Sequence, residues 1–193
     1  MKIALFGGSF NPPHIGHLIV IESVRDALQF DKVLFIPSAQ TPNKQNMMLA
    51  PATTRFAMTQ LSIESNSAFE VSDIEIQRKG ISYTIDTINE LAGKFPHASL
   101  SLIIGADNLL EFETWKSPND ILAKVELIVM NRPGFDVHSV DSKLARSATF
   151  VNVPSIGISS TDIRRRIKLG RSIQYLVPKK VHDYIRERHL YRE

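Results

Sequence analysis

The chain has 193 residues, of which 43% are hydrophobic, and this is enough to bury a substantial core in one domain. Its 23 lysines and arginines against 20 aspartates and glutamates give a formal net charge of +3, which excludes a strongly basic surface but not a local cleft for an anion. The absence of cysteine excludes disulfides, thiolate catalysis and cysteine-based zinc sites.

The beginning of the chain predicts a strand, a helix and a second strand. Residues 3–6 form a short apolar run, which is typical of a strand covered on both faces. Residues 18–28 carry apolar side chains at helical spacing, and residues 32–37 are again apolar and end at a proline. Such a unit predicts parallel strands joined by a right-handed crossover. The apolar run after Met1 and Lys2 is too short for a signal peptide or a membrane span, so we expect a cytoplasmic protein.

The rest of the chain continues this alternation after a polar stretch at residues 38–48, which we expect to be a surface loop. We expect strands at residues 69–76, 100–104, 127–130 and 150–153, and helices at residues 52–62, 83–95, 160–169 and 178–189. This order predicts the α/β class with a doubly wound, mainly parallel sheet, and the last two helices form a small helical element. The sequence contains no repeat, low-complexity segment or linker, so we treat residues 1–193 as a single domain.

Four segments directly follow predicted strands, namely residues 7–17, 38–44, 105–107 and 132–134. In doubly wound sheets the ligand binds beyond the carboxyl ends of the strands. We therefore expect these segments to lie at one edge of the sheet and to form the ligand site.

The first of these segments is rich in glycine and histidine. Gly7 and Gly8 allow a ligand to approach the main chain, and a turn from strand into helix offers N–H groups and a helix dipole to an anion. His14 and His17 fall on one side of the first helical turn, and Gly16 adds no side chain to obstruct them. The set predicts a triphosphate site, although each histidine alone is also typical of a surface or capping residue. The spacing fits neither a Rossmann dinucleotide fingerprint nor a Walker loop, and no third ligand for zinc is placed nearby.

Residues 158–164 carry a second group of polar side chains. Ser159, Ser160 and Thr161 precede a helical pattern, so they are typical N-cap residues, and the arginines after them would then form a solvated helix face. The alternative is a second phosphate site, in which the hydroxyl and N–H groups donate to phosphate and Arg164 offers its planar guanidinium. This segment alone does not decide between the two.

The pair of segments does resemble a known family. His14-Ile15-Gly16-His17 and Ile158-Ser159-Ser160-Thr161-Asp162-Ile163-Arg164 resemble the HxGH and ISSTxIR-type signatures of the nucleotidyltransferase superfamily. Within it, the chain resembles the bacterial nicotinate-nucleotide adenylyltransferases, from about residue 1 to residue 190. The further features are residues 7–17, residues 81–87 with Ser82-Tyr83-Thr84, Ile104-Gly105-Ala106-Asp107 with Trp115, Asn131-Arg132-Pro133-Gly134 and Tyr175-Leu176-Val177-Pro178. One departure is Thr41-Pro42-Asn43-Lys44, where the family often has Pro-Pro-His-Lys.

The resemblance implies a Rossmann-like nucleotidyltransferase fold and transfer of the adenylyl group of ATP to nicotinate mononucleotide, which yields deamido-NAD and pyrophosphate. It implies Mg²⁺ bridging the phosphates of ATP, and we assign no protein ligand to this metal. The implied catalytic residues are His14, His17, Arg164 and Lys44. The implied ATP contacts are Gly7, Gly8, Ser9, Phe10, His14, Gly16, His17, Gly105, Asp107, Ile158, Ser160, Thr161 and Arg164. The implied contacts of the nicotinate nucleotide are Ser9, Lys44, Tyr83, Thr84, Asp107 and Trp115.

The acceptor residues have alternative interpretations. Trp115 offers a flat face to the pyridine ring, but a single tryptophan is more often a buried core or lid residue. Tyr83 and Thr84 lie at a predicted helix start, where N–H groups suit a carboxylate, and a capped helix without a ligand is the alternative. Asp107 suits a ribose hydroxyl or simply caps the turn that follows it.

Other functions stay open. One is transfer to another phosphate acceptor, such as nicotinamide mononucleotide or phosphopantetheine, against which the Ser-Tyr-Thr sequence and Trp115 argue. Another is a nucleic-acid-binding module, because residues 164–193 contain ten lysines and arginines, although no nucleic-acid motif accompanies them. The intact His14, His17 and Arg164 argue against a catalytically inactive domain. We expect ATP and nicotinate mononucleotide as partners, neither nucleic acid nor membrane, and leave a homo-oligomer open.

Overall fold

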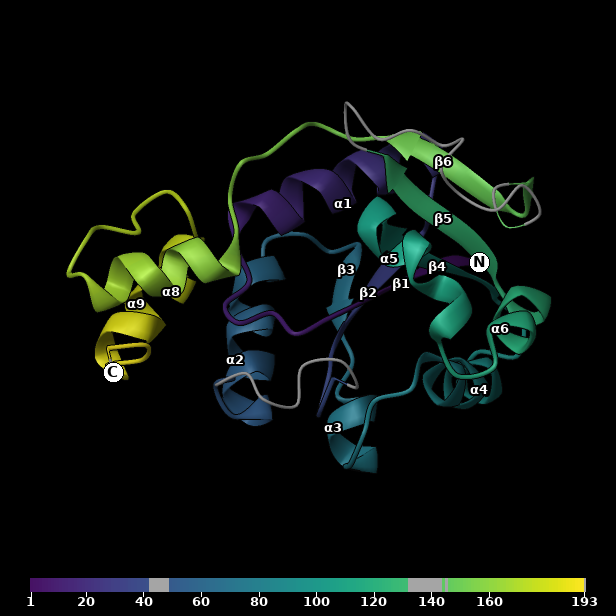
Figure 1. Ribbon diagram of the computed structural model, residues 1–193, viewed down its shortest axis with the longest axis horizontal. Coiled ribbons are helices and arrows are strands. Elements are labelled where there is room, and N and C mark those ends of the chain that lie inside the picture. Colours follow the sequence, from purple (N-terminus) through teal and green to yellow (C-terminus); the bar gives the residue numbers. More distant parts are fainter. Residues whose placement is uncertain (42–48, 132–143, 145, 193) are drawn as a thin grey trace.

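A six-stranded sheet forms the centre of the computed structural model, which describes the chain except for residues 42–48, 132–143, 145 and 193 (Figure 1). All strand pairs are parallel, in the order β3-β2-β1-β4-β5-β6. The order reverses between β1 and β4, as in doubly wound sheets. The predicted fold class is therefore confirmed. The strands are β1 (Lys2–Gly8), β2 (Lys32–Pro37), β3 (Phe69–Val71), β4 (Ser99–Gly105), β5 (Glu126–Asn131) and β6 (Ala148–Asn152).

Helices cover both faces of the sheet because alternate strand residues point to opposite sides. Ile3 and Leu5 of β1 belong to a buried cluster with residues of α4, α5 and α6. Ala4 and Phe6 belong to a second cluster, with residues of α1 and α2. The helices are α1 (Ile15–Leu28), α2 (Ala52–Ile63), α3 (Ile74–Arg78), α4 (Thr84–Lys94), α5 (Ala106–Leu110), the 3₁₀ helix η2 (Phe112–Thr114), α6 (Pro118–Lys124), α8 (Ser160–Lys168) and α9 (Lys179–Glu187).

The last two helices pack beside α2, at the opposite end of the molecule from α4 and α6 (Figure 1). Met58 of α2 shares a third buried cluster with Ile163 of α8 and Val181 and Ile185 of α9. This is the small helical element predicted from the sequence, and it packs the carboxyl end of the chain against α2, one of the helices that cover the sheet. None of the helices in the described part of the chain is long and apolar enough to cross a membrane.

The strand predicted at residues 69–76 is wrong in its carboxyl half. β3 ends at Val71, and the chain turns at Ser72 and Asp73 before α3 begins. The N–H of Ser72 donates to the carbonyl of Phe35, at 2.9 Å, and the N–H of Gln77 already donates to Asp73, at 2.9 Å. The apolar residues on the two sides of this turn gave the appearance of one alternating strand.

The short helices between β4 and β5 were also not predicted. No helix was predicted directly after the strand at residues 100–104, but α5 begins at Ala106 and is followed by η2 and α6. Helices of this length contain too few turns to leave a clear helical period in the sequence. In addition, β1 continues through Gly7 and Gly8, which pair with Ile36 and Pro37 of β2.

Candidate active site

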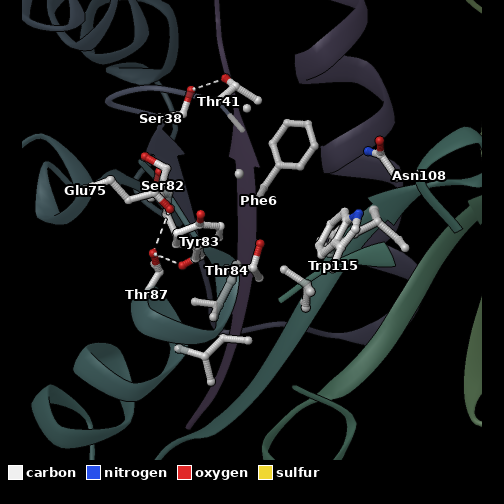
Figure 2. A pocket seen from close by; sticks show the side chains of 18 of the residues that line it. Phe6, Ser38, Thr41, Glu75, Ser82, Tyr83, Thr84, Thr87, Asn108 and Trp115 are labelled. Atoms are coloured by element: carbon white, nitrogen blue, oxygen red, sulfur yellow. Dashed lines mark hydrogen bonds between the residues drawn. The ribbon is translucent and has the colours of Figure 1, made fainter. Parts of the chain in front are cut away.

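A cavity of about 320 Å³ lies where the strand order reverses, beyond the carboxyl ends of β1 and β4. Gly7, Gly8 and Ser9 line it from the end of β1, and Gly105 lines it from the end of β4. The remaining wall includes the segment that starts α4 and the segment around Trp115. Figure 2 shows Trp115 on one side of the cavity and Tyr83 and Thr84 on the other. Several residues predicted from the sequence to bind ligands thus lie around one cavity, at the edge where ligands of such sheets bind.

The two predicted histidines lie together at the start of α1. Their rings are stacked, with centroids 3.6 Å apart and planes 19° apart. His14 is the N-cap: its Nδ1 accepts from the N–H of His17 at 3.3 Å, and His17 Nδ1 accepts from the N–H of His14 at 3.2 Å. Because Nδ1 is an acceptor in both rings, each neutral ring carries its proton on Nε2. The capping role and a role as Nε2 donors are therefore compatible.

Gly16 allows this arrangement because it has no side chain. A Cβ atom at Gly16 would lie 3.0 Å from Nδ1 of His14 and 3.1 Å from a methyl group of Ile156. Both distances are shorter than ordinary van der Waals contact, so any larger residue would displace the His14 ring. The glycine between the histidines thus permits close packing around His14, as the sequence suggested.

His17 is next to the cavity through aromatic contacts. Its ring centroid lies 5.4 Å from that of Phe10 and 6.2 Å from that of Phe6, and Phe6 lines the cavity (Figure 2). Phe10 is buried and has a φ of 45°, a left-handed conformation that bulky residues rarely adopt. The loop after β1 is therefore held in one specific conformation between the sheet and the histidines.

The segment at residues 158–164 packs against this loop, as the predicted phosphate site requires. The hydroxyl of Ser160 donates to the carbonyl of Pro12 at 2.8 Å, and Nη1 of Arg164 donates to the carbonyl of Asn11 at 2.8 Å. Nη2 of Arg164 donates to the Thr161 hydroxyl at 3.3 Å. Ser159 is the N-cap of α8, since its hydroxyl accepts from the N–H of Asp162 at 3.1 Å. The fold thus joins two segments that are about 150 residues apart in the sequence.

Comparisons with known proteins agree with this geometry. Residues 5–166 match the Cytidylyltransferase-like family. A protein of Salinibacter ruber named "Probable nicotinate-nucleotide adenylyltransferase" is 43% identical over 192 residues, which cover 100% of this chain and 98% of that protein. The chain belongs to the nicotinate-nucleotide adenylyltransferase family. A protein of the same name from Thermus thermophilus is 42% identical over 192 residues, covering 100% of both chains.

Solved structures have the same fold as this chain. A nicotinic acid mononucleotide adenylyltransferase of Plasmodium falciparum complexed with NaAD has a TM-score of 0.80 at 18% identity and covers 98% of this chain and 97% of that chain. The same enzyme complexed with APC has a TM-score of 0.78 at 17% identity, with coverage of 98% and 96%. The resemblance found in the sequence and the Rossmann-like fold that it implied are both confirmed.

Other predicted site residues do not line the cavity or lie outside the described residues. Asp107 is exposed in the first turn of α5 and does not line the cavity, whereas Asn108 does. Ile158 packs at the edge of the buried cluster of α8 and α9. Lys44 and residues 132–134 lie outside the described residues. Their predicted roles stay predictions.

The position of Trp115 is compatible with both interpretations, a core residue and a face for a planar ligand. Its ring lies 5.2 Å from the buried ring of Phe112 and packs against the core cluster, but the residue is only half-buried and lines the cavity. On the other side of the cavity lies the ring of Tyr83 (Figure 2), with Nζ of Lys116 4.5 Å from its centroid, and Lys116 pairs with Asp86 at 3.1 Å. The cavity therefore has aromatic faces on both sides, which suits a planar ring.

The sequence analysis missed Glu75, a buried carboxyl that lines the cavity. It accepts a hydrogen bond from the Thr87 hydroxyl at 2.7 Å, and Thr87 accepts one from Arg78 at 2.8 Å (Figure 2). Burial raises the pKa of Glu75, while hydrogen bonds from Ser82 and Thr87 partly oppose this shift. The wrong strand assignment at residues 69–76 hid this residue, because it belongs to α3.

Arg55 was also missed, although the sequence contains a signal for it. Arg55, Met58, Thr59 and Ser62 recur at the spacing of one helix face, and all four are buried in α2. An arginine on the buried face of a helix needs polar partners inside the protein, and Arg55 finds them in backbone carbonyls of the loops around the site. Burial lowers the pKa of its guanidinium, which nevertheless remains charged.

Asn11 fixes the same loop from two further directions. Its Oδ1 accepts from the N–H of Ala50 at 3.1 Å, just before α2, and from the Tyr191 hydroxyl at 2.8 Å. Burial raises the pKa of Tyr191, so the phenol remains a protonated donor. The loop between β1 and α1 is thus held both by α2 and by the carboxyl end of the chain.

Proposed function

We propose that the protein transfers the adenylyl group of ATP to nicotinate mononucleotide, forming deamido-NAD and pyrophosphate. The observation that supports this most directly is the junction of two segments at one sheet edge. His14 and His17 lie against the loop to which Ser160 and Arg164 also bind, and this loop adjoins the cavity lined by Tyr83 and Trp115. A site for phosphates and a site for an aromatic acceptor are therefore neighbours in a chain of this family.

The reaction needs no general base. The attacking oxygen belongs to the phosphate of the acceptor, which is mostly ionised at about pH 7 because its second pKa is about 6. This oxygen forms a bond to the α-phosphorus, and the bond from the α-phosphorus to the oxygen bridging to the β-phosphate breaks. The electron pair leaves with pyrophosphate. Catalysis then requires in-line placement and stabilisation of the charge that develops on the phosphate oxygens.

In this proposal the histidines and Arg164 stabilise that charge. His14 and His17 donate from Nε2, because Nδ1 of each ring is occupied as an acceptor of backbone N–H groups. Arg164, with Ser160 and Thr161, binds the departing pyrophosphate through its guanidinium and the amino end of α8. Neither part requires a covalent intermediate.

Mg²⁺ would be held by the substrate rather than by the protein. In the part of the chain that the structure describes, no group of three or more histidine, aspartate or glutamate side chains lies close enough to hold a metal ion. Mg²⁺ prefers oxygen ligands and keeps several of its waters, so oxygens of the triphosphate together with water would suffice to bind it. When bound, Mg²⁺ neutralises part of the charge on the phosphates.

The acceptor would bind with its pyridine ring at Trp115 and its carboxylate at the start of α4. Tyr83 is the N-cap of this helix, and no side chain caps it, so N–H groups of its first turn are suited to a carboxylate. We further propose that residues 1–193 act as a single domain, because α8 is needed to complete the phosphate site. A cytoplasmic location fits an enzyme that consumes ATP.

The test of this function is pyrophosphate release from ATP with three separate acceptors: nicotinate mononucleotide, nicotinamide mononucleotide and phosphopantetheine. We expect the highest kcat/KM with nicotinate mononucleotide, because the N–H groups at α4 favour a carboxylate over a neutral amide. Product formation with phosphopantetheine alone would overturn the acceptor assignment. Binding of random duplex DNA that weakens with salt would instead support the nucleic-acid alternative.

Trp115→Ala is expected to raise KM for nicotinate mononucleotide by about 10- to 100-fold, since stacking of an aromatic ring on a base contributes about 1–3 kcal/mol. KM for ATP should stay within about threefold of the wild-type value, because Trp115 is proposed to stack on the pyridine ring of the acceptor and not to contact ATP. Steady-state kinetics with each substrate varied in turn measure both values. Leu110→Ala, at an exposed apolar residue before η2, is the control and should change neither. Equal increases in both KM values would contradict the placement of the ring.

A further inference from the structure

Arg55 is a buried cation whose hydrogen-bond partners in the described part of the chain are all backbone carbonyls. It is 1% exposed. Its Nε donates to Ala50 at 2.9 Å, Nη1 to Ser9 at 2.7 Å, and Nη2 to Ser38 at 2.6 Å and Ala39 at 3.2 Å. Among the described residues, no carboxylate forms an ion pair with it. A buried charge without an acidic partner is costly, so these four contacts must hold it in place.

Three of the four carbonyls belong to the segments that build the two halves of the site, and the fourth, that of Ala50, lies just before α2. Ser9 lies in the loop that follows β1 and leads to the stacked histidines, while Ser38 and Ala39 lie in the loop that follows β2. These two loops are also joined directly, since the N–H of Ser38 donates to the carbonyl of Gly8 at 2.9 Å. One guanidinium thus contacts both loops.

Hydrogen bonds with Ser82 connect the loop after β2 to the proposed acceptor side of the cavity. The N–H of Ala39 donates to the Ser82 hydroxyl at 2.9 Å, and the N–H of Ser82 donates to the carbonyl of Gln40 at 2.8 Å. Ser82 immediately precedes Tyr83, the N-cap of α4. A shift of the Ala39 carbonyl would therefore move the start of α4 relative to the phosphate loop.

On the phosphate side, Arg55 fixes a peptide unit. Its bond to the Ser9 carbonyl directs the N–H of Phe10 away from Arg55, because the two groups of a trans peptide point in opposite directions. Phe10 has a φ of 45°, which is unfavourable for a bulky side chain and needs support from its surroundings. A charge-assisted hydrogen bond to the preceding carbonyl provides that support.

We propose that Arg55 is a positioning residue. It sets the position of the loop after β1, which leads to the proposed phosphate site, relative to the loop after β2, which is bonded to the start of α4 at the proposed acceptor site. It governs the alignment of the acceptor phosphate with the α-phosphorus and has little effect on the affinity for either substrate. This inference rests on the proposed function, because it concerns the same two half-sites. The proposal predicts that losing the planar guanidinium of Arg55 lowers kcat, while the KM values stay nearly constant.

The test is Arg55→Lys, which keeps the charge but replaces a planar group with five N–H donors by an ammonium that cannot reach all four carbonyls. We expect kcat to fall by about 10²-fold, the cost of a small misalignment of reacting groups, while both KM values change by less than about threefold. The matched control is Arg25→Lys, at the surface pair of Arg25 with Glu22 on α1, and it should leave kcat unchanged. Circular dichroism and a thermal melt establish that each variant is folded.

Two outcomes would overturn the proposal: an unchanged kcat in folded Arg55→Lys, or a rise of either KM at constant kcat. If Arg55→Lys does not fold, Ser82→Ala tests the same connection, because it removes the hydroxyl that holds the N–H of Ala39. A lower kcat at constant KM would then support the proposal, and an unchanged kcat would overturn it. The comparison uses whichever acceptor the wild-type protein accepts, so a wrong acceptor assignment would not be mistaken for a failure of this inference.

Discussion

In His17→Ala, kcat is expected to fall by about 10²- to 10³-fold, the loss that follows removal of one donor to a developing charge. His17 lies in the first turn of α1, stacked on His14 and in contact with Phe6 at the cavity. Its Nδ1 accepts from a backbone N–H, so Nε2 is the ring nitrogen that carries the proton in the neutral ring and is proposed to donate to the oxygens of the α-phosphate. KM for ATP should change less than kcat, because the charge develops in the transition state.

Pyrophosphate release under saturating substrates measures this effect, together with a thermal melt. The variant also loses the bond from the His14 N–H to the His17 ring, which is part of a helix cap and contributes about 0.5–2 kcal/mol to stability. His97→Ala is the matched control, because His97 is exposed between α4 and β4 and should change neither kcat nor stability. A folded His17→Ala variant with kcat within about threefold of the wild type would contradict the proposed role.

The predicted strands and long helices were confirmed where burial imposes a simple period on the sequence. In β1 both faces are buried, so the apolar run from Ile3 to Phe6 is continuous, and α1 and α2 show their helical spacing over three to four turns. The prediction was wrong at residues 72–76, where Ser72 and Asp73 turn the chain between two apolar stretches. There the sheet ends because helical pairing begins with the bond from the N–H of Gln77 to the carbonyl of Asp73, and no local sequence pattern indicates that bond.

In the site, too, features set by local sequence patterns could be predicted, and those set by contacts between distant segments could not. His14, His17 and Arg164 could be singled out as candidates because they lie in segments that resemble the two signatures of the family, and their roles stay predictions. The roles of Arg55 and Glu75 depend on partners such as Ser9 and Ser82, which only the folded chain brings near them. An arginine on the buried face of α2 indicates that some internal partner exists, but not which loops supply it.

Arg164→Ala is expected to lower kcat by about 10³-fold, the lower end of the effect of an arginine that stabilises charge in phosphoryl transfer. It should also raise the inhibition constant of pyrophosphate as a product inhibitor, because the guanidinium is proposed to bind the leaving group. The matched control is Arg165→Ala. The side chain of Arg165 is 72% exposed and, within the described part of the chain, pairs only with Asp162 of the same helix, so its loss should change neither quantity.

The product-inhibition constant separates two roles that Arg164 could have. In this structure its Nη1 binds the carbonyl of Asn11, so the residue could act only by tying α8 to the loop before α1. In that case Arg164→Ala would lower the melting temperature and kcat, but pyrophosphate would bind the folded variant as it binds the wild type. If Arg164 contacts the leaving group, Arg164→Ala should bind pyrophosphate more weakly than the wild type. Its loss of stability should then be no larger than that of one hydrogen bond, about 0.5–1.5 kcal/mol. Arg164→Lys extends the comparison, because it restores the charge without the planar fork and should recover only part of the lost kcat.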